Sequence, residues 1–341
     1  MSDEIDILED NLLNTYGVDV FAALLKDHTM SRGLPEGQQR NIFWATHDYE
    51  QLGHGYEYTS PILPQLITGS RSKVIMPRVL KARERQESRS RDMAEVFTPS
   101  WICNAQNNLI DAEWFGRKGV FNREITKKDG THAWASTHGK ISFPMGKTWK
   151  DYVKDNRLEI TCGEAPYIVS RYDSTTGEEI RVERRIGFLD RKLRVVNENT
   201  ITEKEWIHAA KVALMSTYGY EWQGDNLLLA REAVFYTVID NFKHKFSKPL
   251  PKRYAKAFAY IISWNLWQMD GLKCVVPCSC HDEVTNSADM FSGVAATAPC
   301  RGCVSGDIRL HNGTYCVIRD WHKSFSRPGK GSEIEFVTLV R

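Results

Sequence analysis

Apolar residues recur at helical spacing in several parts of the chain. Over residues 6–27 the leucines, valines and phenylalanine predict an amphipathic helix followed by a second short helix. The same period predicts further helices over residues 99–114, 203–217, 226–243 and 252–268. Short strands are predicted at 158–161 and 220–224. Strands and helices that alternate from 158 to 268 are typical of an α/β fold with a parallel sheet.

The remaining segments lack a clear period. Residues 40–60 are rich in aromatics and glycines, which predicts loops or short strands, and residues 73–80 are expected to be extended. Residues 115–150 are polar and are interpreted as an insertion or irregular loop. These changes in character predict three regions: an N-terminal helical and aromatic-rich region 1–92, a domain 93–273 that contains the insertion, and a cysteine-rich module 274–341.

Composition is that of an ordinary globular protein, with 341 residues, 42% hydrophobic and 26% charged. The formal net charge of +2 indicates no global basic field. The acidic first residues do not resemble a signal peptide, and the longest apolar stretches are too short to span a membrane. We therefore expect a soluble, cytoplasmic protein without a membrane partner.

Positive charge is nevertheless clustered locally. Residues 81–91 hold Arg83, Arg85, Arg89 and Arg91 with few acids. Such a run is either the solvated face of a helix or a patch that contacts nucleic-acid phosphates, and both interpretations stay open.

Cysteines are unevenly distributed, because six of the eight fall between Cys274 and Cys316. In a reducing cytosol clustered cysteines are more often metal ligands than disulfides. A Cys-x-Cys pair (Cys278, Cys280) and a Cys-x-x-Cys pair (Cys300, Cys303) predict a structural zinc site, with Cys278 or Cys316 as alternative fourth ligands. His281 and His311 are further candidates, and free thiols in a surface loop are the alternative.

Three acid-containing turns follow one another in the predicted α/β region. Glu159 lies before Cys162 and Gly163, where a glycine would let the backbone approach a ligand. Asp190 could accept two hydrogen bonds from ribose hydroxyls, and Asp225 could accept one from an adenine amine. The alternative for both aspartates is a helix N-cap, and the two roles are compatible.

The order of these turns resembles class I S-adenosylmethionine-dependent methyltransferases, and more narrowly the adenine-N6 DNA methyltransferases of restriction–modification systems. Residues 94–102 read Ala-Glu-Val-Phe-Thr-Pro-Ser-Trp-Ile, similar to the Phe-Thr-Pro motif that covers the methionine end of the cofactor in that family. Residues 159–165 resemble the family's Asp-Pro-x-Cys-Gly-x-Gly motif, with Glu, Ile and Ala as departures. The whole chain also resembles bacterial and phage proteins labelled restriction endonuclease subunit M.

The resemblance implies a Rossmann-like sheet with helices on both faces, together with S-adenosylmethionine as the cofactor. The residues it implies as cofactor contacts are Phe97, Thr98, Pro99, Glu159, Cys162, Gly163, Asp190 and Asp225. The family's (Asp/Asn/Ser)-Pro-Pro-(Tyr/Phe/Trp) tetrapeptide, which holds the target base, does not follow Asp225. The nearest match is at residues 164–167, so Pro166 and Tyr167 are the catalytic candidates if that segment is a diverged catalytic loop rather than a cofactor loop.

Two functions follow from this comparison. The first is a DNA adenine-N6 methyltransferase of a restriction–modification or phage-defence system, acting on double-stranded DNA with a possible specificity or restriction subunit. The second is a methyltransferase-like subunit that has lost catalysis and binds DNA or a partner, because the tetrapeptide is missing. Methyl transfer to another base or to RNA is a third, weaker alternative.

Overall fold

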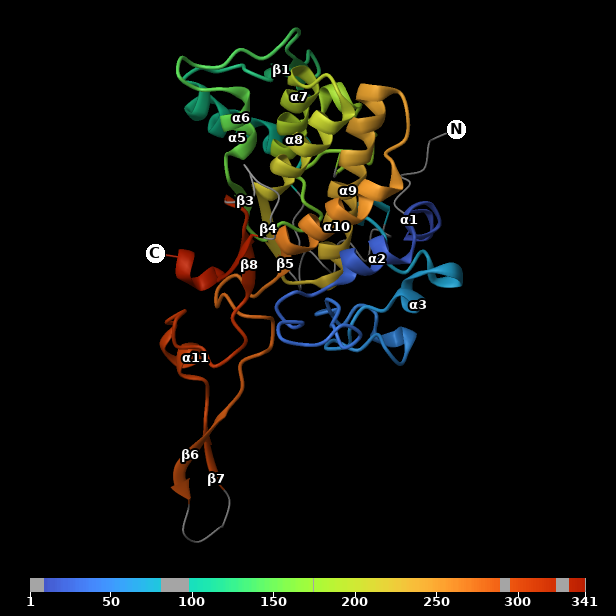
Figure 1. Ribbon diagram of the computed structural model, residues 1–341. Coiled ribbons are helices and arrows are strands. Elements are labelled where there is room, and N and C mark those ends of the chain that lie inside the picture. The colour runs from blue at the N-terminus through green and yellow to red at the C-terminus, as the bar shows by residue number, and fades with distance from the viewer. Residues whose placement is uncertain (1–8, 81–97, 174, 289–294, 323–330, 341) are drawn as a thin grey trace.

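The computed structural model describes residues 9–80, 98–173, 175–288, 295–322 and 331–340. The fold is a mixed α/β arrangement, in which a body of helices packs against a small sheet and part of the C-terminal region extends away from it (Figure 1). None of the helices in the described part of the chain combines the length and apolar character that a membrane span requires. The order of helices and strands confirms the expected α/β class, while a Rossmann-like sheet stays a prediction.

A three-stranded parallel sheet lies at the centre of the body. Its strands are β3 (Arg157–Glu159), β4 (Thr217–Glu221) and β5 (Leu266–Gln268), in the order β3-β4-β5. Arg157 pairs with Thr217 and Gly219 pairs with Leu266, so the carboxyl ends of the strands share one edge. Ligands of open α/β sheets bind outside this edge.

Long helices connect the strands, as parallel pairing requires. Between β3 and β4 run α7 (Phe188–Asn199) and α8 (Glu203–Met215). Between β4 and β5 run α9 (Gly224–Phe246) and α10 (Lys252–Asn265). Thr202 caps α8 by accepting a hydrogen bond from the Glu205 amide, and 16 residues of α9 are buried, as expected for a central helix.

The N-terminal residues cover the body beside α9 and α10. They form α1 (Glu9–Tyr16), α2 (Val18–Leu25), α3 (Pro64–Ile67) and the 3₁₀ turns Glu50–Leu52, Gly69–Arg71 and Arg78–Leu80. Trp44 is fully buried and its ring lies 4.6 Å from that of Tyr49. The amide of Gly224 donates to the Trp44 carbonyl, and a Cβ on Gly224 would lie 2.1 Å from the Phe43 carbonyl oxygen. This backbone contact therefore requires glycine at the start of α9.

The segment before β3 contains a hairpin that the sequence pattern does not predict. After α5 (Ser100–Phe115) come the antiparallel strands β1 (Asn122–Thr126) and β2 (His132–Ser136), followed by α6 (Trp149–Lys154). The 3₁₀ turn Val182–Arg184 lies beyond β3, before α7. Of the two interpretations of residues 115–150, the irregular loop is therefore wrong, and an insertion stays a prediction. Most side chains of β1 are exposed, so no alternation of apolar and polar residues marks the strand.

The C-terminal residues form an arm that leaves the body and returns to it. The arm contains β6 (Glu283–Ala288), β7 (Ala295–Ala298) and α11 (Arg301–Ser305), and Figure 1 shows the hairpin at its far end. The chain returns through β8 (Val317–Asp320), β9 (Ser332–Glu335) and the 3₁₀ turn Phe336–Leu339. A second apolar cluster, with Tyr220, Trp267, Cys316 and Ile318 among its members, joins these residues to the central sheet.

Two buried carboxyl groups between α1 and α9 predict a pH-dependent stability. Glu9 and Glu232 are each 1% exposed, and their carboxyl oxygens accept no hydrogen bond from the described residues. Burial, reinforced by Glu232, raises the pKa of Glu9 to about 10, and burial raises the pKa of Glu232 to about 8. The folded state therefore binds more protons than the unfolded state above about pH 4.5, so stability falls as the pH rises from there toward 8.

Glu232→Gln removes one of these groups, so we expect the variant to be more stable than the wild type at pH 8 and nearly equal to it at pH 4.5. Urea unfolding at the two pH values measures the difference. Glu113→Gln, on the exposed surface of α5, is the control that should leave the pH profile unchanged. Parallel profiles for Glu232→Gln and the wild type would contradict the expected burial effect.

Candidate metal centre and sheet edge

Four side chains converge at the base of the C-terminal arm. The ligand atoms of Cys280, Cys300, Cys303 and His311 all lie within 4.8 Å of one another. The three sulfur atoms lie 3.6, 3.6 and 3.7 Å from Nδ1 of His311. A zinc ion with bonds of about 2.3 Å to sulfur and 2.0–2.1 Å to nitrogen, at tetrahedral angles, separates S and N by roughly 3.6 Å. The cluster can therefore hold a metal ion such as zinc.

Local backbone geometry brings these ligands together. Cys280 precedes β6, Cys300 lies at the N-cap of α11, and Cys303 lies within α11. A Cβ on Gly302 would lie 2.6 Å from the ring and backbone of His311, so glycine is required for the histidine to approach α11. A Cβ on Gly313 would likewise lie 3.0 Å from the sulfur of Cys280, so glycine at this position leaves room for that ligand.

Hydrogen bonds favour the thiolate of Cys300 in this cluster, whereas burial and the neighbouring Cys300 and Cys303 raise the pKa of Cys280 to about 11. The Asn312 amide donates to the sulfur of Cys300 over 3.3 Å. Burial opposes the Cys300 thiolate, but backbone donors from Asn312 and Cys303 and the His311 ring lower its pKa to about 6. Burial opposes the charge of Lys273, but nearby Asp270, Cys303 and Cys280 raise its pKa. Lys273 therefore supplies a positive charge that would offset three thiolates around a divalent ion.

Two of the predicted ligands lie elsewhere, which corrects the expected ligand set. Cys278 is exposed, with its sulfur 3.9 Å from the Tyr58 hydroxyl. Cys316 is fully buried and its thiol contacts the Gln268 carbonyl over 3.3 Å, within the apolar cluster against the sheet. His311, considered only as a further candidate, occupies the fourth position instead.

The loop that follows β3 has an unusual backbone. Thr161, Gly163 and Ala165 have φ values of 45°, 53° and 64°, so two residues with side chains adopt the left-handed region. Such conformations cost about 1–3 kcal/mol each and cluster at functional sites. The loop is held against the next strand, because Cys162 N donates to the Tyr220 carbonyl and Gly163 N donates to Oε2 of Glu221.

Two buried acids organise this edge of the sheet. Glu159 accepts hydrogen bonds from the amides of Tyr167 and Ile168 over 3.3 and 3.1 Å, which closes the loop on itself. Burial raises the pKa of Glu159 well above its usual value and also raises that of Glu221. Glu221 was not among the predicted site residues; its position at the end of β4 is the signal that could have found it.

Both predicted aspartates make internal contacts. Asp190 is the third residue of α7, and its Oδ2 accepts from Gly187 N and from the amide and hydroxyl of Ser170. It therefore lies in the first turn of α7 and accepts from the amide of the N-cap residue, Gly187, rather than being the N-cap itself. Asp225 is fully buried in the first turn of α9, where Oδ2 accepts from the Tyr49 hydroxyl over 2.8 Å.

The Phe-Thr-Pro motif is described only in part. Phe97 and the arginines at 83, 85, 89 and 91 lie outside the described residues. Pro99 is the N-cap of α5, and the Thr98 side chain is hydrogen-bonded to Tyr167 in the loop after β3. The motif therefore meets the loop that contains Pro166 and Tyr167, although the two lie more than 60 residues apart in sequence.

In comparisons with known proteins, no protein family, curated protein or solved structure matches the chain.

Proposed function

We propose that the protein is an S-adenosylmethionine-dependent DNA adenine-N6 methyltransferase of a restriction–modification or phage-defence system, with a structural zinc ion in its C-terminal arm. The observation that carries the enzymatic part is the loop of residues 160–168. Its left-handed backbone, its contact with Thr98 and its position at the carboxyl edge of a parallel sheet are features expected of a cofactor loop.

The proposed reaction requires positioning more than acid–base chemistry. The bound cofactor would supply an activated methyl group on a sulfonium. Gly163 would allow the backbone to approach the cofactor, and Thr98 and Pro99 would lie over its methionine end. The methyl group would pass from the sulfonium to the adenine N6, which would lose a proton to solvent, and the thioether product would be released.

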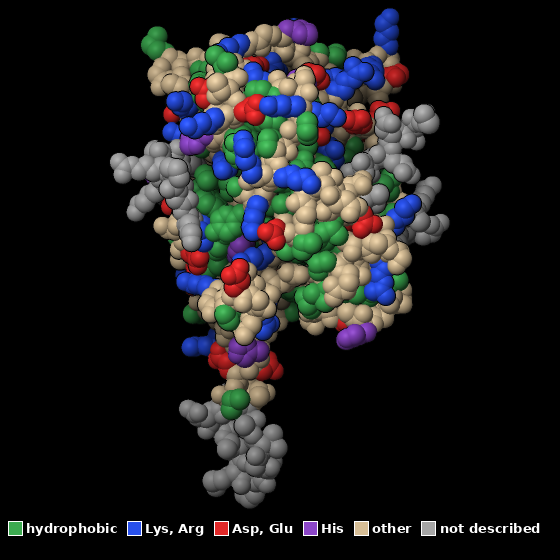
Figure 2. Space-filling model, turned by 45° about the vertical axis from the view of Figure 1, so that its right-hand side comes forward, with side chains coloured by type: hydrophobic (Ala, Val, Ile, Leu, Met, Phe, Trp, Pro, Cys, Tyr) green, Lys and Arg blue, Asp and Glu red, His purple; other side chains and the backbone are tan. Residues whose placement is uncertain are grey.

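A second candidate function is that of a non-catalytic subunit that binds DNA or a protein partner. Asp190 and Asp225 favour it, because their carboxylates already accept hydrogen bonds within the protein. Lys and Arg side chains on the face shown in Figure 2 are spread among acids rather than gathered into one patch. The arginines of residues 81–91 are the candidates for contact with DNA phosphates.

Cofactor binding and labelled methyl transfer to varied duplex DNA test the enzymatic proposal. Gly163→Val should abolish cofactor binding measured by calorimetry, because a β-branched residue does not tolerate a φ of 53°. Gly130→Val is the matched control, since Gly130 also has positive φ but lies in the exposed β1–β2 turn. Cofactor binding without methyl transfer would favour the second function. If the wild type does not bind S-adenosylmethionine at all, the assignment of the loop of residues 160–168 as a cofactor site is contradicted.

A further inference from the structure

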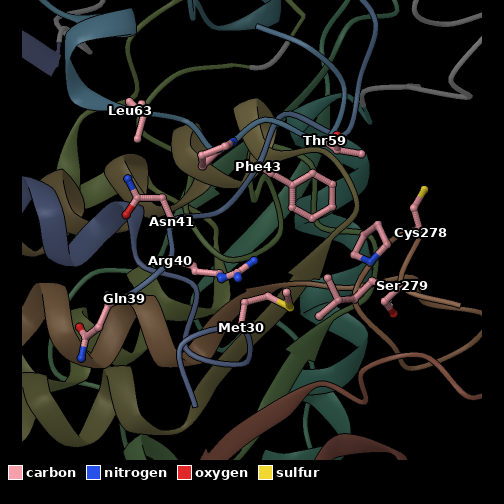
Figure 3. Close-up of a pocket in the computed structure, with 12 residues that line it drawn as sticks. Met30, Gln39, Arg40, Asn41, Phe43, Thr59, Leu63, Cys278 and Ser279 are labelled. Atoms are coloured by element: carbon pink, nitrogen blue, oxygen red, sulfur yellow. Dashed lines mark hydrogen bonds between the residues drawn. The ribbon is translucent and has the colours of Figure 1, made fainter. Parts of the chain in front are cut away.

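A cavity of about 460 Å³ lies between the N-terminal residues and the start of the C-terminal arm. It is distinct from the loop after β3. Figure 3 shows its lining side chains, which come from Met30, Gln39–Asn41, Phe43, Thr59, Pro61, Leu63 and Val276–Ser279. Its volume falls in the range of small-molecule sites, about 300–1,000 Å³.

Both walls of the cavity are held by hydrogen bonds to fixed structure. The Gln268 side chain at the end of β5 accepts from Phe43 N and donates to Phe43 O, over 3.0 and 2.9 Å. On the other wall, Val276 N donates to the Thr314 carbonyl and the Ser279 hydroxyl donates to the Val276 carbonyl. This wall leads directly to the metal ligand Cys280. The cavity is therefore framed by the sheet edge and by the metal centre.

The lining residues select for a particular charge. No aspartate or glutamate is among them, and Arg40 is the one Lys or Arg. In Figure 3 its guanidinium extends toward the space between Met30 and Phe43. Arg40 forms no ion pair with the described residues, but its charge acts on the nearby Asp27 carboxyl, whose pKa is raised by burial against the opposing effect of Arg40. The Arg40 side chain is exposed, so its donors can still reach an anion in the cavity.

The uncharged lining residues select for a planar, partly polar ligand. The Phe43 ring offers a stacking surface, and Met30, Pro61, Leu63 and Val276 supply apolar walls. Gln39 and Asn41 also line the cavity, but in Figure 3 their amides extend away from the Arg40 guanidinium, and the Asn41 amide donates to the Ile62 carbonyl over 2.8 Å. Phe43 and Arg40 are therefore the residues that would define the ligand. An aromatic heterocycle that carries one anionic group satisfies all of these features together.

We propose that this cavity binds a nucleoside monophosphate unit, with the base against Phe43 and the phosphate at Arg40. The unit is either a free nucleotide or a nucleotide of a nucleic-acid strand, because both present the same chemistry. The proposal does not rest on methyl transfer.

Calorimetry with AMP and adenosine tests the site in the full-length protein. We expect AMP to bind more tightly than adenosine, and Arg40→Gln to weaken AMP binding by roughly tenfold or more while adenosine binding stays unchanged. Phe43→Leu should weaken both ligands by roughly tenfold, because it removes the stacking surface but keeps the backbone contact with Gln268. Arg253→Gln, an exposed arginine on α10, is the matched control that should change neither affinity.

The same variants identify the source of the nucleotide. If Arg40→Gln also weakens binding of a short single-stranded oligonucleotide, the unit belongs to a strand; if it weakens AMP binding alone, the ligand is a free nucleotide. No AMP binding at millimolar concentration, or equal AMP affinities of the wild type and Arg40→Gln, would overturn the proposal. S-adenosylmethionine affinity measured on Arg40→Gln should be unchanged, which separates this site from the proposed cofactor loop.

Discussion

Purified wild-type protein is expected to hold one equivalent of metal at the Cys280, Cys300, Cys303 and His311 cluster, and Cys303→Ser is expected to lose it. Loss of an outer-shell partner alone costs 10–100-fold in metal affinity, so loss of one of four ligands should cost more than about hundredfold. Gly302 is the buried residue of α11, so apolar burial contributes little to holding this helix in place without an ion. Elemental analysis and limited proteolysis of the arm measure the two effects.

Cys278→Ser is the matched control for the metal centre, because Cys278 lies two residues from Cys280 but outside the cluster. The variant should retain one equivalent of metal and the proteolytic stability of the wild type. Loss of metal from Cys278→Ser, or its full retention by Cys303→Ser, would contradict the Cys280, Cys300, Cys303 and His311 ligand set.

Three of the four metal ligands were predictable, because spacing alone identifies the Cys300–Cys303 turn and the nearby pair that contains Cys280. The fourth depends on how the chain folds back. His311 is eight residues beyond Cys303, and it reaches the sulfurs only because Gly302 leaves room for its ring. Sequence spacing does not encode that close approach, and Cys316 looked equivalent until the structure placed it in an apolar cluster.

The central sheet was predictable in part for similar reasons. Helices α8 and α9 follow the predicted periodicity closely, and the expected strands at 158–161 and 220–224 overlap β3 and β4. Strand β5 was interpreted as the last turn of a helix over 252–268. It has three residues and all of them are buried, and periodicity cannot separate so short a buried strand from the end of a buried helix.

Site residues were harder to assign than elements. The sequence indicates an acid near the end of each predicted strand, but it does not show which carboxylates are used internally. Asp190 accepts from the amide of Gly187 at the start of α7, whereas Glu221, to which the sequence assigned no role, accepts the hydrogen bond from Gly163. Which acid faces the loop depends on where each strand ends, and strand boundaries are the least reliable part of a sequence prediction.

Asp111→Ala is expected to destabilise the body by about 3–5 kcal/mol, the usual cost of leaving a buried partner charge uncompensated. Asp111 is 1% exposed, accepts a hydrogen bond from Tyr152 over 2.8 Å and forms ion pairs with Arg157 and Arg191. Both arginine side chains are almost completely buried, so neither can recover hydration when the carboxylate is removed. Urea unfolding followed by circular dichroism measures the change in the free energy of unfolding.

Asp19→Ala is the matched control, because it breaks an exposed pair with Lys256 and should shift the unfolding midpoint only slightly. If Asp111→Ala does not fold, Asp111→Asn should fold with an intermediate loss, since an amide can still accept from Tyr152 but cannot neutralise two arginines. Equal midpoints for the two alanine variants would contradict the argument. Arg157 begins β3, so loss of its ion pair with Asp111 should also loosen the loop of residues 160–168. The affinity for the proposed cofactor should therefore fall in Asp111→Asn but not in Asp19→Ala.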